Sequence, residues 1–198
     1  MKHRTSTRLG LALLLLALAG AFAFAQISGQ TPFGKVTVTG GNLSRESFTA
    51  PWKWTRSARS GQITVTSGGL NLKCDALTAW LAKKGNDFER LEATGNIHLQ
   101  GTYSTPDKQT WDLTGSAQSA TFTSKDATGV LHGNVHLRAV NVATKEVETL
   151  DADRFTYNVK TGAFAFDSEG EKPVHLERTP APAPALPTPA APPSGTPK

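Results

Sequence analysis

The sequence contains a single cysteine, Cys74, among its 198 residues. A lone thiol cannot form an intramolecular disulfide or a zinc site built from several cysteines, so apolar packing and backbone hydrogen bonds must hold the fold together. The sequence also lacks a GxSxG elbow, an HExxH helix, a phosphate-binding glycine loop and a dinucleotide fingerprint. We therefore predict that the protein is not an enzyme and requires no cofactor.

A clustered surplus of positive charge is lacking as well. Lys and Arg number 21 against 16 Asp and Glu, for a net charge of +5. Three of the basic residues, Lys2, Arg4 and Arg8, stand at the extreme N-terminus, and the rest of the chain is close to neutral. Because nucleic-acid binding requires grouped Lys and Arg side chains, no nucleic-acid partner is expected.

Residues 1–25 have the features of a secretory signal peptide. A basic start is followed by the apolar stretch Leu9–Ala21, and Ala23–Ala25 offers the small residues that a signal peptidase needs. Cleavage is predicted before Gln26, which would release the mature protein into the periplasm. The alternative is an uncleaved membrane anchor, although the hydrophobic segment Leu9–Ala25 is near the lower length limit for a spanning helix.

The C-terminal segment 179–198 consists almost entirely of Pro, Ala, Thr, Ser and Gly. Such a composition cannot bury enough apolar surface to offset the entropy lost on ordering. We predict a disordered Pro/Ala-rich tail, and we expect a single folded domain over residues 33–178.

The middle of the chain is typical of strands. Apolar and polar residues alternate with a period of two in short runs rich in Thr, Val, Ile, Leu and aromatic residues. Long runs with helical periodicity are lacking. Representative strands are predicted over 62–66, 95–99, 111–113 and 162–166. Each strand then has one apolar and one polar face, as in an all-β sheet folded around a single apolar interior.

Two short units repeat along this region. The first is Gly-polar-β-branched-polar-aliphatic, and it begins at Gly61, Gly95 and Gly133. The second unit has a small residue three positions before an apolar one. It occurs as the pairs Cys74 and Leu77, Ala117 and Ala120, and Ala152 and Phe155. The spacing of the second unit breaks strict alternation, so a β-bulge is expected on its strand to keep both residues on one face.

A pair of antiparallel strands cannot bury its own apolar face, whereas several stacked pairs enclose a continuous interior. The repeats therefore predict an all-β fold, either a β-jelly-roll or a short β-solenoid. Cys74 takes the place that Ala117 and Ala152 hold in the other repeats. This position predicts a small buried apolar residue and not a nucleophile.

Several stretches together carry a family resemblance, and they are Leu70–Leu77, Phe88–Ile97 and Gly129–Val135. In order and content they resemble the OstA-like domain of the periplasmic lipopolysaccharide-transport proteins typified by LptA. Asp151–Tyr157 and Lys160–Gly162 continue the pattern. The segment Leu43–Gln62, with Trp52 and Trp54, departs from it, and so does the Pro/Ala-rich tail.

The resemblance implies an open, twisted β-jelly-roll that shields lipid acyl chains and passes them along a bridge across the envelope. The implied cargo is lipopolysaccharide or a related glycolipid, and the implied partners are other jelly-roll transport proteins of the envelope. We expect the unpaired edge strands of such an open roll near Lys35–Thr39 and Pro173–Glu177. Edges of this kind can pair with those partners, or head to tail with a second copy of the chain.

Alternation assigns the large apolar residues to the inner face, Leu70, Trp111 and Phe166 among them. The candidate lipid-groove residues are Ile63, Val65, Leu72, Leu77, Leu91, Ile97, Leu99, Leu113, Phe122, Leu131, Val135, Leu137, Phe155, Tyr157 and Phe164. Alternation alone does not distinguish a groove from a filled core. Two functions stay open: a lipid carrier, which the resemblance implies, and a non-catalytic envelope scaffold with a filled core that binds protein partners through its edges and tail.

Polar side chains of the outer face give little sign of chemistry. His98 and His136 hold equivalent places in their repeats, yet no third ligand completes a metal set. Asp151 and Asp153 flank Ala152 on one side of a strand, without a nearby nucleophile. We interpret all four as solvated residues and predict neither a catalytic residue nor a metal site.

Overall fold

The computed structural model describes residues 27–31, 34–83, 87–104, 108–168 and 173–180. The predicted signal peptide lies outside these ranges, as does the predicted tail beyond residue 180. The described residues form thirteen strands: β1 (Ile27–Thr31), β2 (Gly34–Thr39), β3 (Asn42–Ser44), β4 (Trp52–Thr55), β5 (Ile63–Ser67), β6 (Leu70–Cys74), β7 (Ala76–Leu81), β8 (Phe88–Ser104), β9 (Thr110–Thr123), β10 (Thr128–Asn141), β11 (Val147–Asn158), β12 (Phe164–Asp167) and β13 (His175–Thr179). None of the elements in these ranges is a helix able to cross a membrane.

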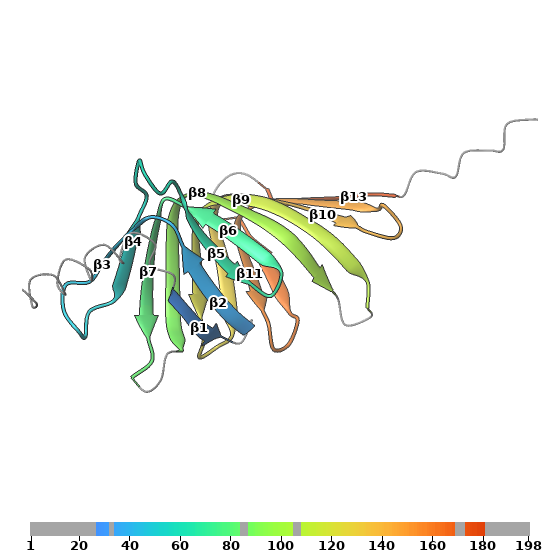
Figure 1. Cartoon of the computed structure of the whole chain (residues 1–198). Helices are drawn as coiled ribbons and strands as arrows, with labels where there is room; N and C mark the ends of the chain where they lie inside the picture. Colours follow the sequence, from blue (N-terminus) through green and yellow to red (C-terminus); the bar gives the residue numbers. More distant parts are fainter. Residues whose placement is uncertain (1–26, 32–33, 84–86, 105–107, 169–172, 181–198) are drawn as a thin grey trace, which may run out of the picture.

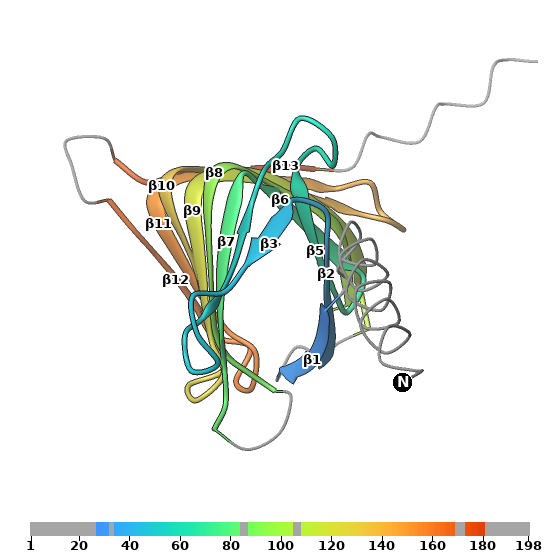
Figure 2. The ribbon, with the colours of Figure 1, turned by 60° about the vertical axis from the view of Figure 1, so that its left-hand side comes forward.

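All strand pairs are antiparallel, and together they make one folded sheet (Figure 1). The first half-sheet has the order β1-β2-β5-β6-β8-β9-β10-β11-β13, and the second has the order β3-β4-β7-β8-β9-β10-β11-β12. The long strands β8 to β11 cross both halves. Viewed along its length, the molecule is an open roll with the two half-sheets facing each other (Figure 2). The predicted all-β, open jelly-roll fold is confirmed.

The half-sheets meet along a crease formed by Gly95 and Asn96 of β8 and Gly133 and Asn134 of β10. These four residues have positive φ angles, from 47° to 77°. At the crease the pairing register shifts, because β8 and β10 each carry one residue more than the strands beside them. A bulge of this kind bends the strand and increases its twist, which folds one long strand over both halves of the roll.

The bulge lies on a different strand from the predicted one. Sequence analysis placed it on the strands that carry Cys74, Ala117 and Ala152, and that prediction is wrong. The register does shift at their level, opposite Gln118 and Asp153, but the extra residue belongs to the strand of the Gly-Asn unit. Glycine and asparagine adopt a left-handed conformation at low cost, whereas alanine and β-branched residues do not.

Asp75 occupies the crease between β6 and β7. Its carboxylate accepts hydrogen bonds from Asn96 Nδ2, from Arg56 Nη1 at 3.2 Å and from Gln62 Nε2 at 3.4 Å. The bond from Asn96 is the main cause that holds the pKa of Asp75 below its ordinary value, and the bonds from Gln62 and Arg56 lower it further. Because the folded state favours the carboxylate, these bonds stabilise the crease above the pKa of the unfolded chain and are lost as the pH falls.

The edge strands differ in part from the predicted ones. Lys35–Thr39 was expected to be unpaired, and this prediction is wrong, because β2 pairs with β5 on one side and with β1 on the other. Ile27 opposes Val38 in the pairing of β1 with β2. The edges of the first half-sheet are β1 and β13, and those of the second are β3 and β12.

A substitution in the crease tests its importance for stability. Gly133 has a φ of 77°, and a Cβ there would lie 2.5 Å from Gln118 Oε1. We expect Gly133→Ala to lower the free energy of unfolding by about 1–2 kcal/mol, the cost of a left-handed alanine. Asn134→Gly is the matched control and should change it by less than about 0.5 kcal/mol, since glycine adopts this conformation freely. Urea denaturation measures both; equal midpoints for Gly133→Ala and the wild type would contradict the role given to the crease.

Candidate functional site

The inner face of the first half-sheet carries an apolar ladder that crosses every strand. Directly opposed residues follow one another from β1 to β13, so their side chains share one face. The first ladder is Ile27, Val38, Val65, Leu72, Leu99, Gly115, Leu137, Leu150 and Leu176. Leu137 packs over Gly115, where an added Cβ would lie 2.4 Å from Leu137 Cδ2.

The second half-sheet carries two such ladders side by side. The second ladder is Leu43, Trp54, Leu77, Ala93, Ala120, Leu131, Phe155 and Phe166. The third ladder is Trp52, Ala79, Leu91, Phe122, Gly129, Tyr157 and Phe164. From β4 to β12 each ladder crosses five intervening strands, a length of roughly 29 Å at about 4.8 Å per step. The facing half-sheets thus present continuous apolar surfaces that run along the roll.

Exposure rises from β4 to β12 along the second and third ladders, whereas in the first ladder Leu137 and Leu150 are still 7% exposed and only the last residue, Leu176, is open. Val38, Trp54 and Ala79, near the N-terminal end, are at most 1% exposed. At the C-terminal end, Phe164 is 65% and Leu176 is 58% exposed. The Phe164 and Phe166 rings stack with centroids 6.2 Å apart and extend the apolar surface to β12. The roll is therefore densely packed at its N-terminal end and open at its C-terminal end.

The candidate groove residues all lie on this inner face. Eleven belong to the ladders: Val65, Leu72, Leu77, Leu91, Leu99, Phe122, Leu131, Leu137, Phe155, Tyr157 and Phe164. Phe164 ends the third ladder. Ile63, Ile97 and Val135 are buried beside the crease, and Leu113 opposes the buried Ala139. The register brings these residues onto one surface; their contact with lipid is taken up below as a proposal.

Within the strands that the structure describes, charged residues interrupt the inner face only near the last strands. Glu148 opposes Ala139 of β10 and Arg178 of β13. Arg178 Nε lies 3.6 Å from Glu148 Oε1 and is hydrogen bonded to Glu146, which lowers the pKa of Glu146. Burial, followed by the charge of Glu148, raises the pKa of the inward Tyr103. The positive charge of Arg178 thus compensates the negative charges of Glu146 and Glu148 at this end.

The polar residues of the outer face do not form a site. His98 and His136 both oppose Ser116 of β9, so a strand separates them. His136 Nδ1 lies 2.6 Å from Asp151 Oδ1, and both side chains are half exposed. Among the described residues no group of three or more His, Cys, Asp or Glu side chains could hold a metal ion. Asp153 lies at the crease, 3.4 Å from Ser168 Oγ.

Cys74 is fully buried beside the crease. Burial, with a smaller contribution from the charge of Asp75, raises the pKa of its thiol to about 12. The thiolate is therefore scarcely populated near neutral pH, and Cys74 packs as the small apolar residue that its repeat position predicts.

Sequence reasoning missed the role of Trp52 and Trp54. It treated their segment as a departure from the family pattern, but both residues lie on β4, where Trp52 begins the third ladder and Trp54 follows Leu43 in the second. Trp54 is 1% exposed, and the rings lie 6.4 Å apart between centroids. The signal was the alternation of Trp-Lys-Trp, which places both indoles on one face.

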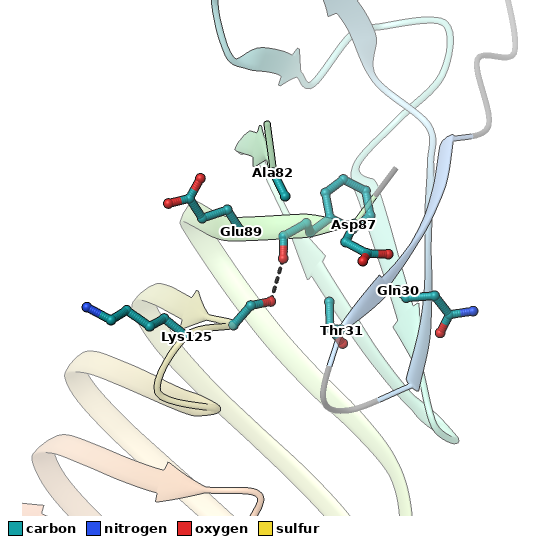
Figure 3. Close-up of a pocket in the computed structure, with 8 residues that line it drawn as sticks. Gln30, Thr31, Ala82, Asp87, Glu89 and Lys125 are labelled. Carbon is teal, nitrogen blue, oxygen red and sulfur yellow. Dashed lines mark hydrogen bonds between the residues drawn. The ribbon is translucent and has the colours of Figure 1, made fainter. Parts of the chain in front are cut away.

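A cavity of about 490 Å³ opens at the rim of the roll, where β1 approaches β8 (Figure 3). Ser124 Oγ donates a hydrogen bond to the carbonyl oxygen of Phe88 at its edge. Most of its lining side chains are polar: Gln30, Thr31, Ala82, Asp87, Phe88, Glu89, Ser124 and Lys125. None of these lining residues belongs to the three ladders.

Comparison with known proteins identifies the family. The family described as "LptA/(LptD N-terminal domain) LPS transport protein" matches residues 47–163, more than half of the chain. Among solved structures, a similar fold occurs in LptH, the LptA homologous periplasmic component of the conserved lipopolysaccharide transport device from Pseudomonas aeruginosa. The identity is 13%, the TM-score is 0.53, and the similarity covers 74% of this chain and 95% of the LptH chain. No curated protein matches the chain in sequence.

The family match confirms the resemblance found in the sequence. It also confirms that the chain is not an enzyme, because the matched family consists of transport proteins. At its low identity the LptH structure supports the fold alone. The chain belongs to the LptA/LptD N-terminal domain family of lipopolysaccharide transport proteins.

Proposed function

We propose that this protein carries lipopolysaccharide through the periplasm with the acyl chains held against the apolar ladders. The observation that supports this role is the continuity of the ladders from the first to the last strands of each half-sheet. Burying a methylene group is worth roughly 0.8 kcal/mol. A dozen methylenes would therefore contribute roughly 10 kcal/mol, which is enough to offset much of the cost of moving an acyl chain through water.

The open C-terminal end is the proposed site of cargo entry or transfer. Phe164, Phe166 and Leu176 leave apolar surface uncovered there, and monomeric soluble proteins seldom leave such surface exposed without a function. The edge strands β12 and β13 lie at the same end. A second jelly roll that paired with either strand would continue both the sheet and the ladders, so that lipid could pass from one protein to the next.

The packed N-terminal end is also compatible with a second function, that of a scaffold. Val38, Trp54, Ile63 and Leu77 are almost fully buried without any ligand, as in a scaffold module with a filled core. On that alternative the edges and the tail bind protein partners, and the inner face never contacts lipid. Crosslinking from the inner face separates the two functions.

A photo-crosslinking residue placed at Leu99, Phe122, Leu137 or Tyr157 should capture lipopolysaccharide in cells. These residues belong to the first and third ladders on facing half-sheets. Capture is read from a lipopolysaccharide-specific immunoblot of the purified protein. At the most buried of these positions the bulky probe should also lower stability by roughly 1–3 kcal/mol.

The matched controls are the adjacent outward positions His98, Thr121, His136 and Thr156. Side chains alternate along a strand, so probes at these positions should capture no lipid. Equal capture from both sets would point to nonspecific membrane contact. A folded protein that captures only protein from the inward positions would favour the scaffold.

Association through the C-terminal end is tested by making that end polar. The double variant Phe164→Ser, Leu176→Ser should reduce concentration-dependent oligomers in sedimentation velocity, because it removes the exposed apolar contacts beside β12 and β13. Val142→Ser is the control, since Val142 is also exposed but lies in the turn after β10. A wild-type protein that stays monomeric at high concentration would refute self-association at this end.

Export is tested at the N-terminus. We propose that the segment ending at Ala25 is removed, so the protein recovered from the osmotic-shock fraction should begin at or near Gln26 by N-terminal sequencing. An intact N-terminus found in the membrane pellet would instead establish the uncleaved anchor.

A further inference from the structure

Two indole groups at the packed end of the roll have no hydrogen-bond partner. The Nε1 atoms of Trp52 and Trp54 are both buried, and no acceptor among the described residues lies within reach of either. Nearly all buried polar groups in proteins are hydrogen bonded, so an exception requires an explanation. Two exceptions on one short strand point to a shared cause.

The neighbours of the two indoles explain why no partner is available. Trp54 opposes Leu43 on β3 and Leu77 on β7, and Trp52 opposes Ala79. These side chains are aliphatic, and β4 pairs with β7 along its whole length and with β3 from Lys53 to Thr55. The two N–H groups are therefore buried among apolar side chains that offer no acceptor, and a ligand oxygen reaches them only when these side chains move aside.

Arg45 holds the Trp52 ring in place. Its guanidinium carbon lies 4.7 Å from the centre of the Trp52 ring. Arg45 Nε donates to the carbonyl oxygen of Ala50 at 2.9 Å, and another of its nitrogens donates to that of Phe48. A ring covered by an anchored cation cannot easily turn its N–H toward water. The orientation of this donor is thus set by the loop between β3 and β4.

We propose that the N–H groups of Trp52 and Trp54 bind the carbonyl oxygens that link acyl chains to the headgroup of the carried lipid. This inference rests on the proposed function, because the two indoles lie at the β4 end of the second and third ladders. A linkage oxygen held at β4 leaves its acyl chain free to extend along the ladders toward β12. Tryptophan suits this position because it combines a large apolar ring with a single polar donor.

The direct test observes the indole protons. In the full-length protein with ¹⁵N-labelled tryptophan, the four tryptophans give four indole signals, and single Trp→Phe variants assign them. On addition of purified lipid A, the signals of Trp52 and Trp54 should move downfield and exchange more slowly with water. The signal of Trp80, whose ring contacts Arg90 at 5.4 Å, serves as the internal control and should not move.

Affinity gives the second measurement. Trp52→Phe and Trp54→Phe keep an aromatic ring and remove the donor, and each should weaken lipid A binding about five- to tenfold, the effect of one net hydrogen bond. Trp80→Phe is the matched control. It makes the same truncation at a residue that follows the inward Ala79 on β7 and therefore points to the outer face, away from the proposed donor pair.

A ligand pair separates the hydrogen bond from packing. Methyl tetradecanoate has an ester carbonyl, and pentadecane has the same number of carbon atoms without one. Loss of affinity in Trp54→Phe should appear for the ester and be absent for the hydrocarbon, in the manner of a double-mutant cycle. An equal loss of affinity for both ligands would mean that the indoles contribute only packing, and it would overturn the inference.

The outcomes also distinguish the two proposals. If lipid A binds the wild type while the Trp52 and Trp54 signals stay unchanged, the carrier function stands and the donor site is refuted. If lipid A binds neither the wild type nor any variant, the carrier function fails and the donor site fails with it.

Discussion

The left-handed conformation of a few residues at the crease is the constraint on which the rest of this structure depends. Gly95, Asn96, Gly133 and Asn134 let β8 and β10 turn sharply while the strands stay paired on both sides of the bend. Without that turn the sheet would be flat and single, and each apolar face would need a separate partner. With it, one sheet supplies both facing surfaces of the interior.

The bend also sets the relation between the ladders. Because the bulge adds a single residue, β8 crosses the crease with four positions from Ala93 to Ile97, whereas β9 crosses it with three, from Ala120 to Ala117. Ile97 and Ala93 are both buried, although they lie on opposite sides of the crease. The bulge thus lets neighbouring strands with even and odd spacing present their apolar residues to the same interior.

Much of this arrangement could be predicted from the sequence, because alternation and repetition are local signals. The inner positions of β8, β9 and β10 follow from their period-two patterns, and the glycine repeats marked the level of the crease. The strand that carries the bulge could not be inferred from apolar spacing, which is the same for either strand of a bulged pair. The choice depends on which residues tolerate positive φ, and the Gly-Asn pairs held that information.

The remaining errors involve short strands. β1 has only Ile27 as a large apolar residue, and β4 has four residues, so neither offers enough alternation to stand out. Their positions are set by partners far along the chain, such as the pairing of Trp54 with Leu77. The gradient of exposure along the roll could not be predicted from the sequence either. It depends on how closely the half-sheets approach at each point, a tertiary property that no local pattern encodes.

The position of the inward charges is consistent with passage of an apolar chain along the roll. An unpaired carboxylate within a ladder would be costly to desolvate each time an acyl chain covered it. Glu148 lies instead in the row beside the first ladder, next to the last strand, where Arg178 compensates it and solvent is near. The three ladders themselves carry no ionisable group other than the phenol of Tyr157. An acyl chain moving between β4 and β12 would therefore meet no uncompensated charge on the ladders, and the change that it would meet from strand to strand is in packing and not in polarity.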